Sequence, residues 1–381
     1  MRVVHVVPRP SIFEGVIQRN SDALGHECLY YESASRSLIS LYLECKRRPG
    51  HLFLFHKVPH VLVLVLSLLL RDFHYALLYW GDDYYSTFIR EADFEAHCLA
   101  KSPMLRQVFY ERLRPKFRSR SRQVLLRHIG FLVLRRAAGI VSLCPKQFRI
   151  LRMFHFKIFG GALRTPQLWI RGYSHESDTV SNTYAQQGGS DSLTVLICHS
   201  AASTVAHKQS LEILREYQKR WGAKIHVRGF LSYSGGDEAA RARLERELVE
   251  ESDFAESVYF ERSFLPLDEV SRRLKEIDVA VFSSLRDEGV SLLTQFVKIG
   301  GVVSFNRFSI NYDFFRVFSP AKLLAHEKFM ELDPSSLCSK RQEATAGFPR
   351  MLEFDELDKL ELENGKLKFA PNYTAAEADA S

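Results

Sequence analysis

Short apolar segments alternate with a longer helical one along the first half of the chain. Residues 2–7, 51–56 and 75–80 have the length and the apolar or aromatic content of buried strands, and the apolar segment 61–70 lies between the last two. A helix between two buried strands is typical of the β-α-β units that build parallel sheets. Residues 139–144 predict a later strand of the same kind. We therefore expect the first half to be a parallel α/β domain.

The second half shows the same alternation more clearly. Segments with helical spacing separate the apolar runs, and glycine or aspartate stands at several of the expected helix ends. This alternation predicts a doubly wound α/β domain, in which ligands bind beyond the carboxyl ends of the strands. The predicted strands are residues 193–198, 224–230, 257–260, 278–283 and 302–305, and the predicted helices are residues 205–221, 237–251, a segment that Asp268 caps, and 289–299.

Length and composition favour two domains. The chain has 381 residues, 46% of them apolar, which is a globular composition and too long for one ordinary core. Residues 166–192 are rich in Ser, Asn and Gln and lack apolar periodicity, so we interpret them as a linker. This division predicts an N-terminal domain at 1–165, a C-terminal domain at 193–335 and a C-terminal extension at 336–381.

Positive charge is concentrated in one segment. The net charge is +7, but residues 101–157 carry fifteen Lys and Arg against the single acid Glu111, so the remainder of the chain is acidic. Such a zone predicts an anionic partner, which is a phospholipid surface, a pyrophosphate or a nucleic acid. Leu, Ile and Phe alternate with the charges, and this mixture favours a membrane surface. A nucleic-acid site has thin support because few aromatic residues accompany the charges, and a solvated helix is the other alternative. The residues expected to face the membrane are Arg114, Lys116, Arg118, Arg120, Arg122, Arg127, Arg135 and Arg136.

Several classes of protein are disfavoured by composition. No apolar run reaches the roughly 18 residues that span a bilayer. The six cysteines are scattered and form no C-x-x-C pair, so we expect neither a metal cluster nor a disulfide framework, and a reducing compartment fits. We expect no metal and no cofactor.

The loops that follow the strands of the first half hold candidates for proton transfer. Asp82 and Asp83 follow the strand that ends at Trp80, and a carboxylate there can act as a general base toward a hydroxyl. His56 ends the neighbouring strand, and Glu14 in the first loop is a weaker candidate base. The structural alternatives are an aspartate that caps a helix and a histidine whose hydrogen bonds are satisfied in the core.

The loops of the second half hold candidates for binding a diphosphate. Ser200 follows the first strand and precedes a helix with His207, so hydroxyls and helix amides can face an anion there. Tyr233 follows the next strand, where an aromatic ring can cover a base. In the segment SLRDEGVSLLTQ, Arg286 offers two donors to a phosphate and Gly289 lets a helix start close to it. Helix caps and an ordinary strand-to-helix loop are the structural alternatives.

The order of these motifs resembles glycosyltransferase family 56, the TDP-N-acetylfucosamine:lipid II N-acetylfucosaminyltransferases. Each motif is weak alone, and their common order along residues 50–373 carries the resemblance. The matching positions are Phe55-His56, Trp80-Gly81-Asp82-Asp83-Tyr84-Tyr85, Ser200 with His207, Tyr233, Arg286, Gly289, Gly300, Asn306-Arg307 and Pro371-Asn372-Tyr373.

The resemblance implies a GT-B fold, with two Rossmann-like domains that face a central cleft. It implies an inverting, metal-independent enzyme that moves a deoxy-amino sugar from a TDP-sugar to a polyprenyl-diphosphate-linked saccharide. The expected pathway is the biosynthesis of a surface polysaccharide like the enterobacterial common antigen, and the expected place is the cytoplasmic face of the inner membrane, bound peripherally.

The resemblance also implies roles for single residues. Asp83 is the expected base, with His56 or Glu14 in reserve, and Trp80 and Tyr85 line the acceptor side. Two alternatives remain open: a nucleotide-sugar transferase with another donor and a surface-polysaccharide acceptor, or a protein that binds nucleic acid through residues 101–157. The expected donor-binding residues are Ser200, His207, Tyr233, Arg286, Gly289, Asn306 and Arg307.

Overall fold

The computed structural model describes two compact units. One contains the described residues from 2 to 169 and from 360 to 369, and the other contains those from 191 to 342. The described residues are 2–9, 14, 17–18, 21–22, 25–32, 35–56, 60–78, 120–142, 151–152, 155–156, 159–169, 191–202, 205–232, 237–284, 289–307, 309–342, 360–363 and 365–369.

The first unit is built on a six-stranded parallel sheet with the order β2-β1-β3-β4-β5-β6. The central strands are apolar on both faces, as strands covered by helices on a parallel sheet must be. The strands are β1 (Val3–Pro8), β2 (Glu27–Tyr31), β3 (Leu52–His56), β4 (His74–Leu78), β5 (Gly139–Ser142) and β6 (Gln167–Trp169).

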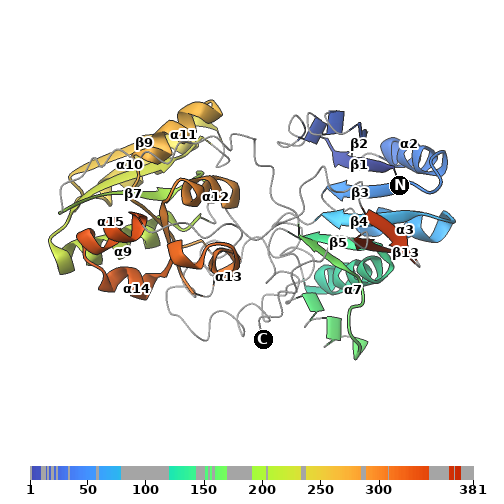
Figure 1. The fold of residues 1–381 in the computed structure, drawn as a ribbon. Coiled ribbons are helices and arrows are strands. Elements are labelled where there is room, and N and C mark those ends of the chain that lie inside the picture. Colours follow the sequence, from blue (N-terminus) through green and yellow to red (C-terminus); the bar gives the residue numbers. More distant parts are fainter. Residues whose placement is uncertain are drawn as a thin grey trace. The chain divides into compact units, whose positions relative to one another are not determined.

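One layer of helices covers one face of this sheet (Figure 1). The layer contains α2 (Ser35–Lys46), α3 (His60–Leu69) and α7 (Arg120–Arg136). The connections from β2 to β3, β3 to β4 and β4 to β5 all step the same way along the sheet, so right-handed crossovers place these helices on the same side. The helices α3 and α7 contact each other.

The end of the chain returns to the first unit. The strands β13 (Leu360–Glu363) and β14 (Lys366–Phe369) form an antiparallel pair. The Leu367 side chain joins a buried cluster with Val3, Leu54 and Val141, and its N–H donates to the Ala138 carbonyl at 2.9 Å. This cluster lies on the sheet face that carries the side chains of Val3, Leu52 and Leu54.

The second unit has a six-stranded parallel sheet with the order β12-β11-β10-β7-β8-β9. This is the doubly wound order of a Rossmann domain, with β7 as the first strand and a change of direction between β7 and β10. The strands are β7 (Ser192–Cys198), β8 (Lys224–Phe230), β9 (Ser257–Glu261), β10 (Val279–Phe282), β11 (Val302–Phe305) and β12 (Leu323–Ala325). The helices are α9 (His207–Trp221), α10 (Glu238–Glu250), α11 (Leu267–Lys275), α12 (Val290–Lys298), α13 (Ile310–Phe318), α14 (His326–Glu331) and α15 (Pro334–Gln342), with a 3-10 turn at Pro320–Lys322.

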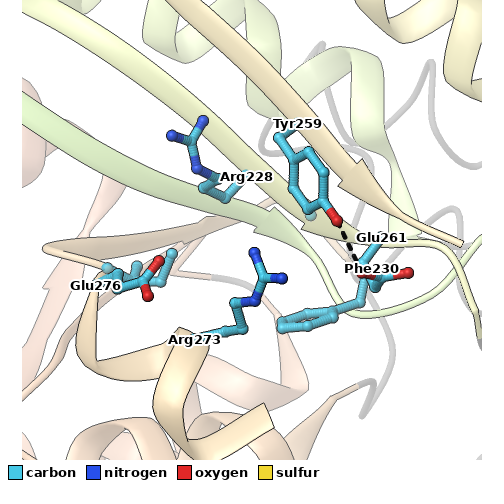
Figure 2. Close-up of a pocket in the computed structure, with 8 residues that line it drawn as sticks. Arg228, Phe230, Tyr259, Glu261, Arg273 and Glu276 are labelled. Carbon is cyan, nitrogen blue, oxygen red and sulfur yellow. Dashed lines mark hydrogen bonds between the residues drawn. The ribbon is translucent and has the colours of Figure 1, made fainter. Parts of the chain in front are cut away.

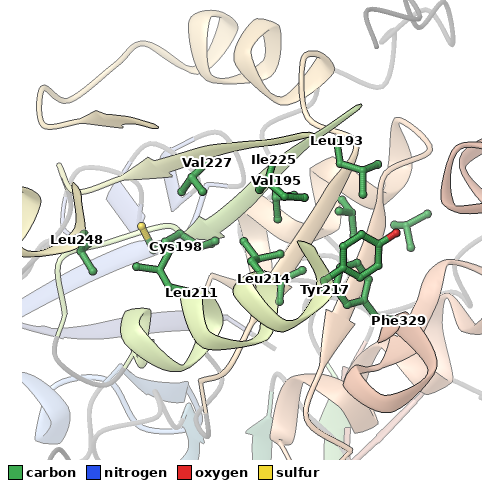
Figure 3. Close-up of a cluster of buried hydrophobic side chains, with 14 of the residues drawn as sticks. Leu193, Val195, Cys198, Leu211, Leu214, Tyr217, Ile225, Val227, Leu248 and Phe329 are labelled. Atoms are coloured by element: carbon green, nitrogen blue, oxygen red, sulfur yellow. The ribbon is translucent and has the colours of Figure 1, made fainter. Parts of the chain in front are cut away.

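The core of the second unit forms where α9 packs on β7 and β8 (Figure 3). Leu211 and Leu214 of the helix are buried against Val195 of the sheet. The Tyr217 ring stacks on Phe329 of α14 with centroids 4.6 Å apart, and its hydroxyl donates to the Leu332 carbonyl at 2.9 Å. An amphipathic helix, once its apolar stripe is buried in this way, fixes the loop that precedes it.

The structure confirms the predicted fold class and adds elements that the sequence pattern does not predict. The edge strands β2, β6 and β12 are absent from the predicted series, and β6 lies inside residues 166–192, the segment interpreted as a linker. Residues 336–381 were expected to form one extension, but 336–342 complete α15 of the second unit while β13 and β14 pack on the first. The predicted cap at Asp268 is wrong, because α11 begins at Leu267 with Pro266 before it.

Candidate functional site at the carboxyl edges of the two sheets

Each sheet has one point where the strand order changes direction, and ligands of open α/β sheets bind beyond the strand ends at such points. In the second unit this point lies between β7 and β10. In the first unit it lies between β1 and β3. The loops at these two places hold several of the described candidate residues.

The loop after β7 is held from within by His207. The Nε2 atom of His207 lies 2.8 Å from the carbonyl oxygen of Ser200 and is the donor to it, and both residues are buried. The Ser200 hydroxyl accepts from the Ala202 N–H at 3.3 Å. Sequence reasoning paired Ser200 with His207, and the structure brings them together, with the contact made through the Ser200 backbone. These two residues shape the loop at the start of α9.

The residue before α9 adopts an unusual backbone conformation. Ala206 has φ 57° and ψ 48°, the left-handed region, and its methyl side chain cannot cap the first turn of the helix. A non-glycine residue in this region costs roughly 1–2 kcal/mol. Such strain is often found at functional sites, where the surrounding contacts enforce it.

Gly289, which follows β10 in the chain, lies against His199 in the loop after β7. Gly289 has φ +69°, and a Cβ atom there would lie 2.9 Å from the His199 ring. The same ring stacks on Phe282 with a centroid distance of 6.0 Å. Only glycine combines this backbone conformation with such a close approach. The sequence motif at Gly289 and the motif at Ser200 therefore meet at the point where the strand order changes.

Helix α12 starts at this meeting point. It begins at Val290, directly after Gly289, which has no side chain to cap it. The first N–H groups of an α-helix have no partner within the helix, and the helix dipole favours negative charge beside them. A diphosphate is a suitable ligand for such amides. Arg286 and Tyr233, which were expected to join this site, lie outside the described residues.

A buried polar cluster lies around the ends of β10 and β11. Ser283 contacts the Ser210 hydroxyl at 3.2 Å and the Nε2 atom of His326 at 3.5 Å, and the Ser304 hydroxyl lies 2.9 Å from Nδ1 of His326. Burial lowers the pKa of His326 to about 3, so the ring is neutral. No motif predicts this cluster, although a serine at the end of each of two apolar strands is a usable signal.

Asn306 and Arg307 follow β11 and face different surroundings. Asn306 is buried, and its carbonyl accepts from the Ser309 N–H at 2.8 Å. Arg307 is exposed and forms an ion pair with Glu327 at 3.4 Å. The donor role expected for Asn306 and Arg307 stays a prediction.

A shallow pocket opens beside β8, β9 and α11 (Figure 2), and no sequence motif predicts it. Its empty volume is about 340 Å³, part of which is open to solvent. The Tyr259 hydroxyl donates to Glu261 at 2.8 Å, and the Arg273 guanidinium lies 5.4 Å from the Tyr259 ring centroid. Burial lowers the pKa of Arg228, which stands on the same wall. Two arginines and two glutamates line the pocket, so its charges largely cancel.

Three histidines form a hydrogen-bonded chain in the first unit. Nδ1 of His5 lies 2.8 Å from Nε2 of His56, and Nε2 of His5 lies 3.0 Å from Nδ1 of His26. All three side chains are buried, on the sheet face of Val3 and Leu54. His56, a predicted catalytic residue, therefore ends β3 beside the change of direction in the strand order, and His5 and His26 are partners that no motif predicts.

Burial keeps His5 and His56 neutral. It lowers the pKa of His56 to about 3, and burial together with the neighbouring His56 and His26 holds the pKa of His5 well below its usual value. The bond between the His5 and His56 rings needs one N–H and one lone pair, so their tautomers are coupled: both carry hydrogen on Nδ1 or both carry it on Nε2. Among the described residues, no group of His, Cys, Asp and Glu has an arrangement that could hold a metal ion.

The other catalytic candidates of the first unit are less well supported or lie elsewhere. The Glu14 carboxylate forms an ion pair with Arg9 at 2.8 Å, and the Arg9 guanidinium lies 4.0 Å above the Tyr30 ring. This ion pair occupies the Glu14 carboxylate. Asp83, Trp80 and Tyr85 lie outside the described residues.

The predicted membrane-facing arginines separate into two groups. Arg127 is buried, so its guanidinium cannot reach a bilayer, and that prediction is wrong for this residue. Arg135 and Arg136 are exposed at the end of α7, and Arg136 donates to the Ser67 carbonyl of α3 at 3.3 Å. Among the described helices, none has both the length and the hydrophobicity that crossing a bilayer requires. The remaining predicted residues, Arg114, Lys116 and Arg118 and the side chains of Arg120 and Arg122, lie outside the described part of the structure.

Comparison with known proteins identifies the fold. No protein-family model and no curated protein sequence matches this chain. The N-terminal domain of Candida albicans trehalose-6-phosphate phosphatase has a TM-score of 0.56 at 9% identity, over 90% of this chain and 89% of that one. The α,α-trehalose 6-phosphate synthase of Burkholderia multivorans has the same score and identity over 89% and 88% of the two chains. Trehalose-6-phosphate synthase OtsA matches with a TM-score of 0.56 and 9% identity over 90% and 94%. The chain has the GT-B fold of two Rossmann-like domains, as predicted.

Proposed function

We propose that this protein is a glycosyltransferase that uses a nucleoside-diphosphate sugar. The observation that carries the proposal is the meeting of Gly289, His199 and the start of α12 at the strand-order change of a Rossmann domain. This arrangement offers backbone amides to a diphosphate at the place where doubly wound domains bind nucleotides. Similar solved structures include a UDP-forming α,α-trehalose-phosphate synthase from Burkholderia vietnamiensis, and this similarity supports a nucleotide-sugar donor.

In the proposed reaction the acceptor hydroxyl attacks the anomeric carbon while the bond to the diphosphate breaks. The α12 amides and Arg286 stabilise the charge that develops on the departing diphosphate, a task that needs donors placed before the reaction begins. Asp83 is the proposed base that takes the proton from the acceptor hydroxyl. His56 is a poorer base in the buried chain described above, because its low pKa leaves little affinity for the proton.

The finer specificity rests on the motif order and the charge distribution of the sequence. We propose an inverting, metal-independent transfer of a deoxy-amino sugar from a TDP-sugar to a polyprenyl-diphosphate-linked saccharide. The motifs shared with glycosyltransferase family 56 support this donor and acceptor class. The basic segment at residues 101–157 supports an anionic, membrane-held acceptor and a peripheral position at the cytoplasmic face of the inner membrane.

A thermal-shift screen with nucleoside diphosphates tests the proposal. UDP, TDP, GDP and ADP are compared with their nucleosides, with and without EDTA. A ligand at about 100 times its Kd adds roughly 2.7 kcal/mol of stability, which is a shift of several degrees. We expect TDP to give the largest shift, a nucleoside without phosphate to give almost none, and EDTA to leave the shift unchanged. Equal, negligible shifts with all four diphosphates would contradict the proposed function.

A further inference from the structure

The helix layer of the first unit exposes an unusual number of large apolar side chains. Fourteen such side chains are exposed among the described residues, and nine of them lie on α2, α3 and α7. The outer layer of a doubly wound domain normally faces water and carries polar residues. The nine residues are Ile39 and Leu43 of α2, Val61, Val65, Leu68 and Leu69 of α3, and Val124, Leu125 and Leu132 of α7.

Helix α3 shows the pattern most clearly. Val61, Val65, Leu68 and Leu69 have the spacing i, i+4, i+7 and i+8 of a single helix face, and between 43% and 62% of each residue is exposed. The opposite face, with Val63 and Leu66, is buried against the sheet. A helix that is apolar all round needs an apolar environment on both sides, and the sheet supplies only one of them.

Helix α7 continues this apolar surface and gives it a charge. Leu125 and Leu132 are exposed two turns apart, and Arg135 and Arg136 are exposed at the end of the same helix. Neither α3 nor α7 contains Asp or Glu, whereas α7 has five arginines. Arg71 is exposed two residues after the end of α3, next to the exposed acid Asp72. Apolar side chains flanked by arginine match the headgroup and acyl layers of an anionic bilayer.

We propose that the outer face of α3 and α7 is a membrane-docking surface that binds an anionic bilayer in the plane of the interface. The apolar side chains of the two helices enter the acyl boundary, and Arg71, Arg135 and Arg136 contact anionic headgroups. The surface lies on the opposite side of the sheet from the buried histidine chain, so docking leaves the sheet face of His5 and His56 uninvolved. This inference deepens the proposed function, since a polyprenyl-linked acceptor is available only at a membrane.

Flotation of the full chain with lipid vesicles tests the surface. Vesicles of pure phosphatidylcholine are compared with vesicles that hold about 30 mol % phosphatidylglycerol, at low and high salt. We expect binding to the anionic vesicles and a drop of about fivefold or more when salt rises from roughly 0.1 to 0.5 M, because the arginine contacts are screened. Absence of binding to anionic vesicles at low salt would overturn the proposal.

Two matched double variants separate the surface from general hydrophobicity. Leu68→Gln with Leu69→Gln removes two exposed leucines from α3, and we expect vesicle binding to fall by at least about tenfold, since each leucine loses its burial in lipid. Val249→Gln with Phe264→Gln removes two exposed apolar side chains from the second unit and is expected to leave binding unchanged. Equal losses in both double variants would also overturn the proposal.

Three further measurements test whether something other than a membrane covers this surface, and whether the docking proposal and the proposed function fail separately. If the leucine variants change the sedimentation of the protein but not its vesicle binding, the face pairs with a second copy and the docking proposal is wrong. If duplex DNA binds with similar salt dependence and competes fully with vesicles, the occupant is a nucleic acid and the proposal is wrong. Nucleoside-diphosphate binding is measured on the same variants: vesicle binding without any diphosphate shift retains the docking surface and rejects the proposed function, and the reverse result rejects only the surface.

Discussion

The two units have sheets of the same kind but outer helices of opposite character. In the second unit, α10 and α11 are laced with ion pairs between neighbouring turns, such as Arg241 with Glu238 and Arg272 with Glu269. In the first unit, α3 and α7 have no acidic residue and expose apolar side chains. Exposed ion pairs add little stability, so the charged helices are best understood as a solvated surface. Each unit has a buried parallel sheet that determines its fold. The units differ in their outer helices, which expose ion pairs in the second unit and apolar side chains in the first.

The units also differ at the carboxyl edges of their sheets. The second unit brings a glycine, a strained Ala206 and two helix starts to one place, which favours an anionic ligand. The first unit buries a chain of imidazoles there, in which His5 and His56 are neutral and so unsuited to neutralising a diphosphate. We infer that the donor binds the second unit and that acceptor chemistry belongs to the first. The predictions below test this division of labour.

The largest expected effect comes from Asp83→Asn. If Asp83 is the base, this change lowers turnover by about 10²- to 10⁴-fold, because general-base catalysis contributes that much. The dissociation constant of the donor diphosphate, measured by calorimetry, is expected to stay within twofold or so of the wild-type value. Unchanged turnover would remove Asp83 as the base, and a large loss of donor affinity would place it in the donor site.

Gly289→Ala is expected to weaken diphosphate binding by about tenfold or more. The new Cβ would strain a backbone at φ +69° and press on the His199 ring, so the start of α12 has to shift. Gly222→Ala is the matched control, since Gly222 has φ +63° and no atom within 4 Å of the added Cβ. Both variants lose stability from backbone strain, and only the first is expected to lose affinity. Equal affinities in the two variants would argue against a donor site at this loop.

Acid is expected to destabilise the first unit before the second. His5 and His56 have folded-state pKa values below the unfolded value of about 6.5, so the unfolded chain takes up protons first as pH falls below that value. Each such histidine removes about 1.4 kcal/mol per pH unit, from about pH 6.5 down to its folded-state pKa. In the described part of the second unit, burial is shown to lower a histidine pKa in this way at His326. Hydrogen exchange of the two units between pH 7 and 5 measures the order, and earlier opening of the second unit would contradict it.

The alternation of apolar and helical segments was sufficient to predict the fold class. It was not sufficient to predict the short elements at the sheet edges. Strands such as β7 and β10 are buried on both faces, so their apolar runs are unambiguous. The edge strand β2 is partly exposed, and β6 has three residues, so neither produces a run that differs from a loop. Hairpin β13–β14 is held by hydrogen bonds from Lys366 to the carbonyls of Arg135 and Ala137, more than 200 residues earlier in the sequence. The local sequence pattern carries no information on such contacts.

Motifs located the site loops but not the partners of their residues. Gly289 and Ser200 were recognisable because glycine and hydroxyl residues at strand ends have few other reasons to occur there. The link from His56 to His5 and His26 joins β3, β1 and the residue before β2, and the order of these strands is a property of the tertiary fold. The burial of Arg127 could not be predicted either, because a helix in a basic segment is expected to be exposed until its packing face is known.

The smallest expected effect separates the outer face of α3 from its inner face. Val65 is exposed and Val63 is fully buried, two residues away on the same helix. Val63→Ala is expected to lower the free energy of unfolding by about 1–2 kcal/mol or more, because it leaves a cavity in the core. Val65→Gln is expected to change the free energy of unfolding by less than about 0.5 kcal/mol, and the same is expected of Val249→Gln on the second unit. Urea unfolding curves measure all three. If Val65→Gln destabilises as much as Val63→Ala, the outer face of α3 is covered within the folded chain, and the contrast between the two helix layers disappears.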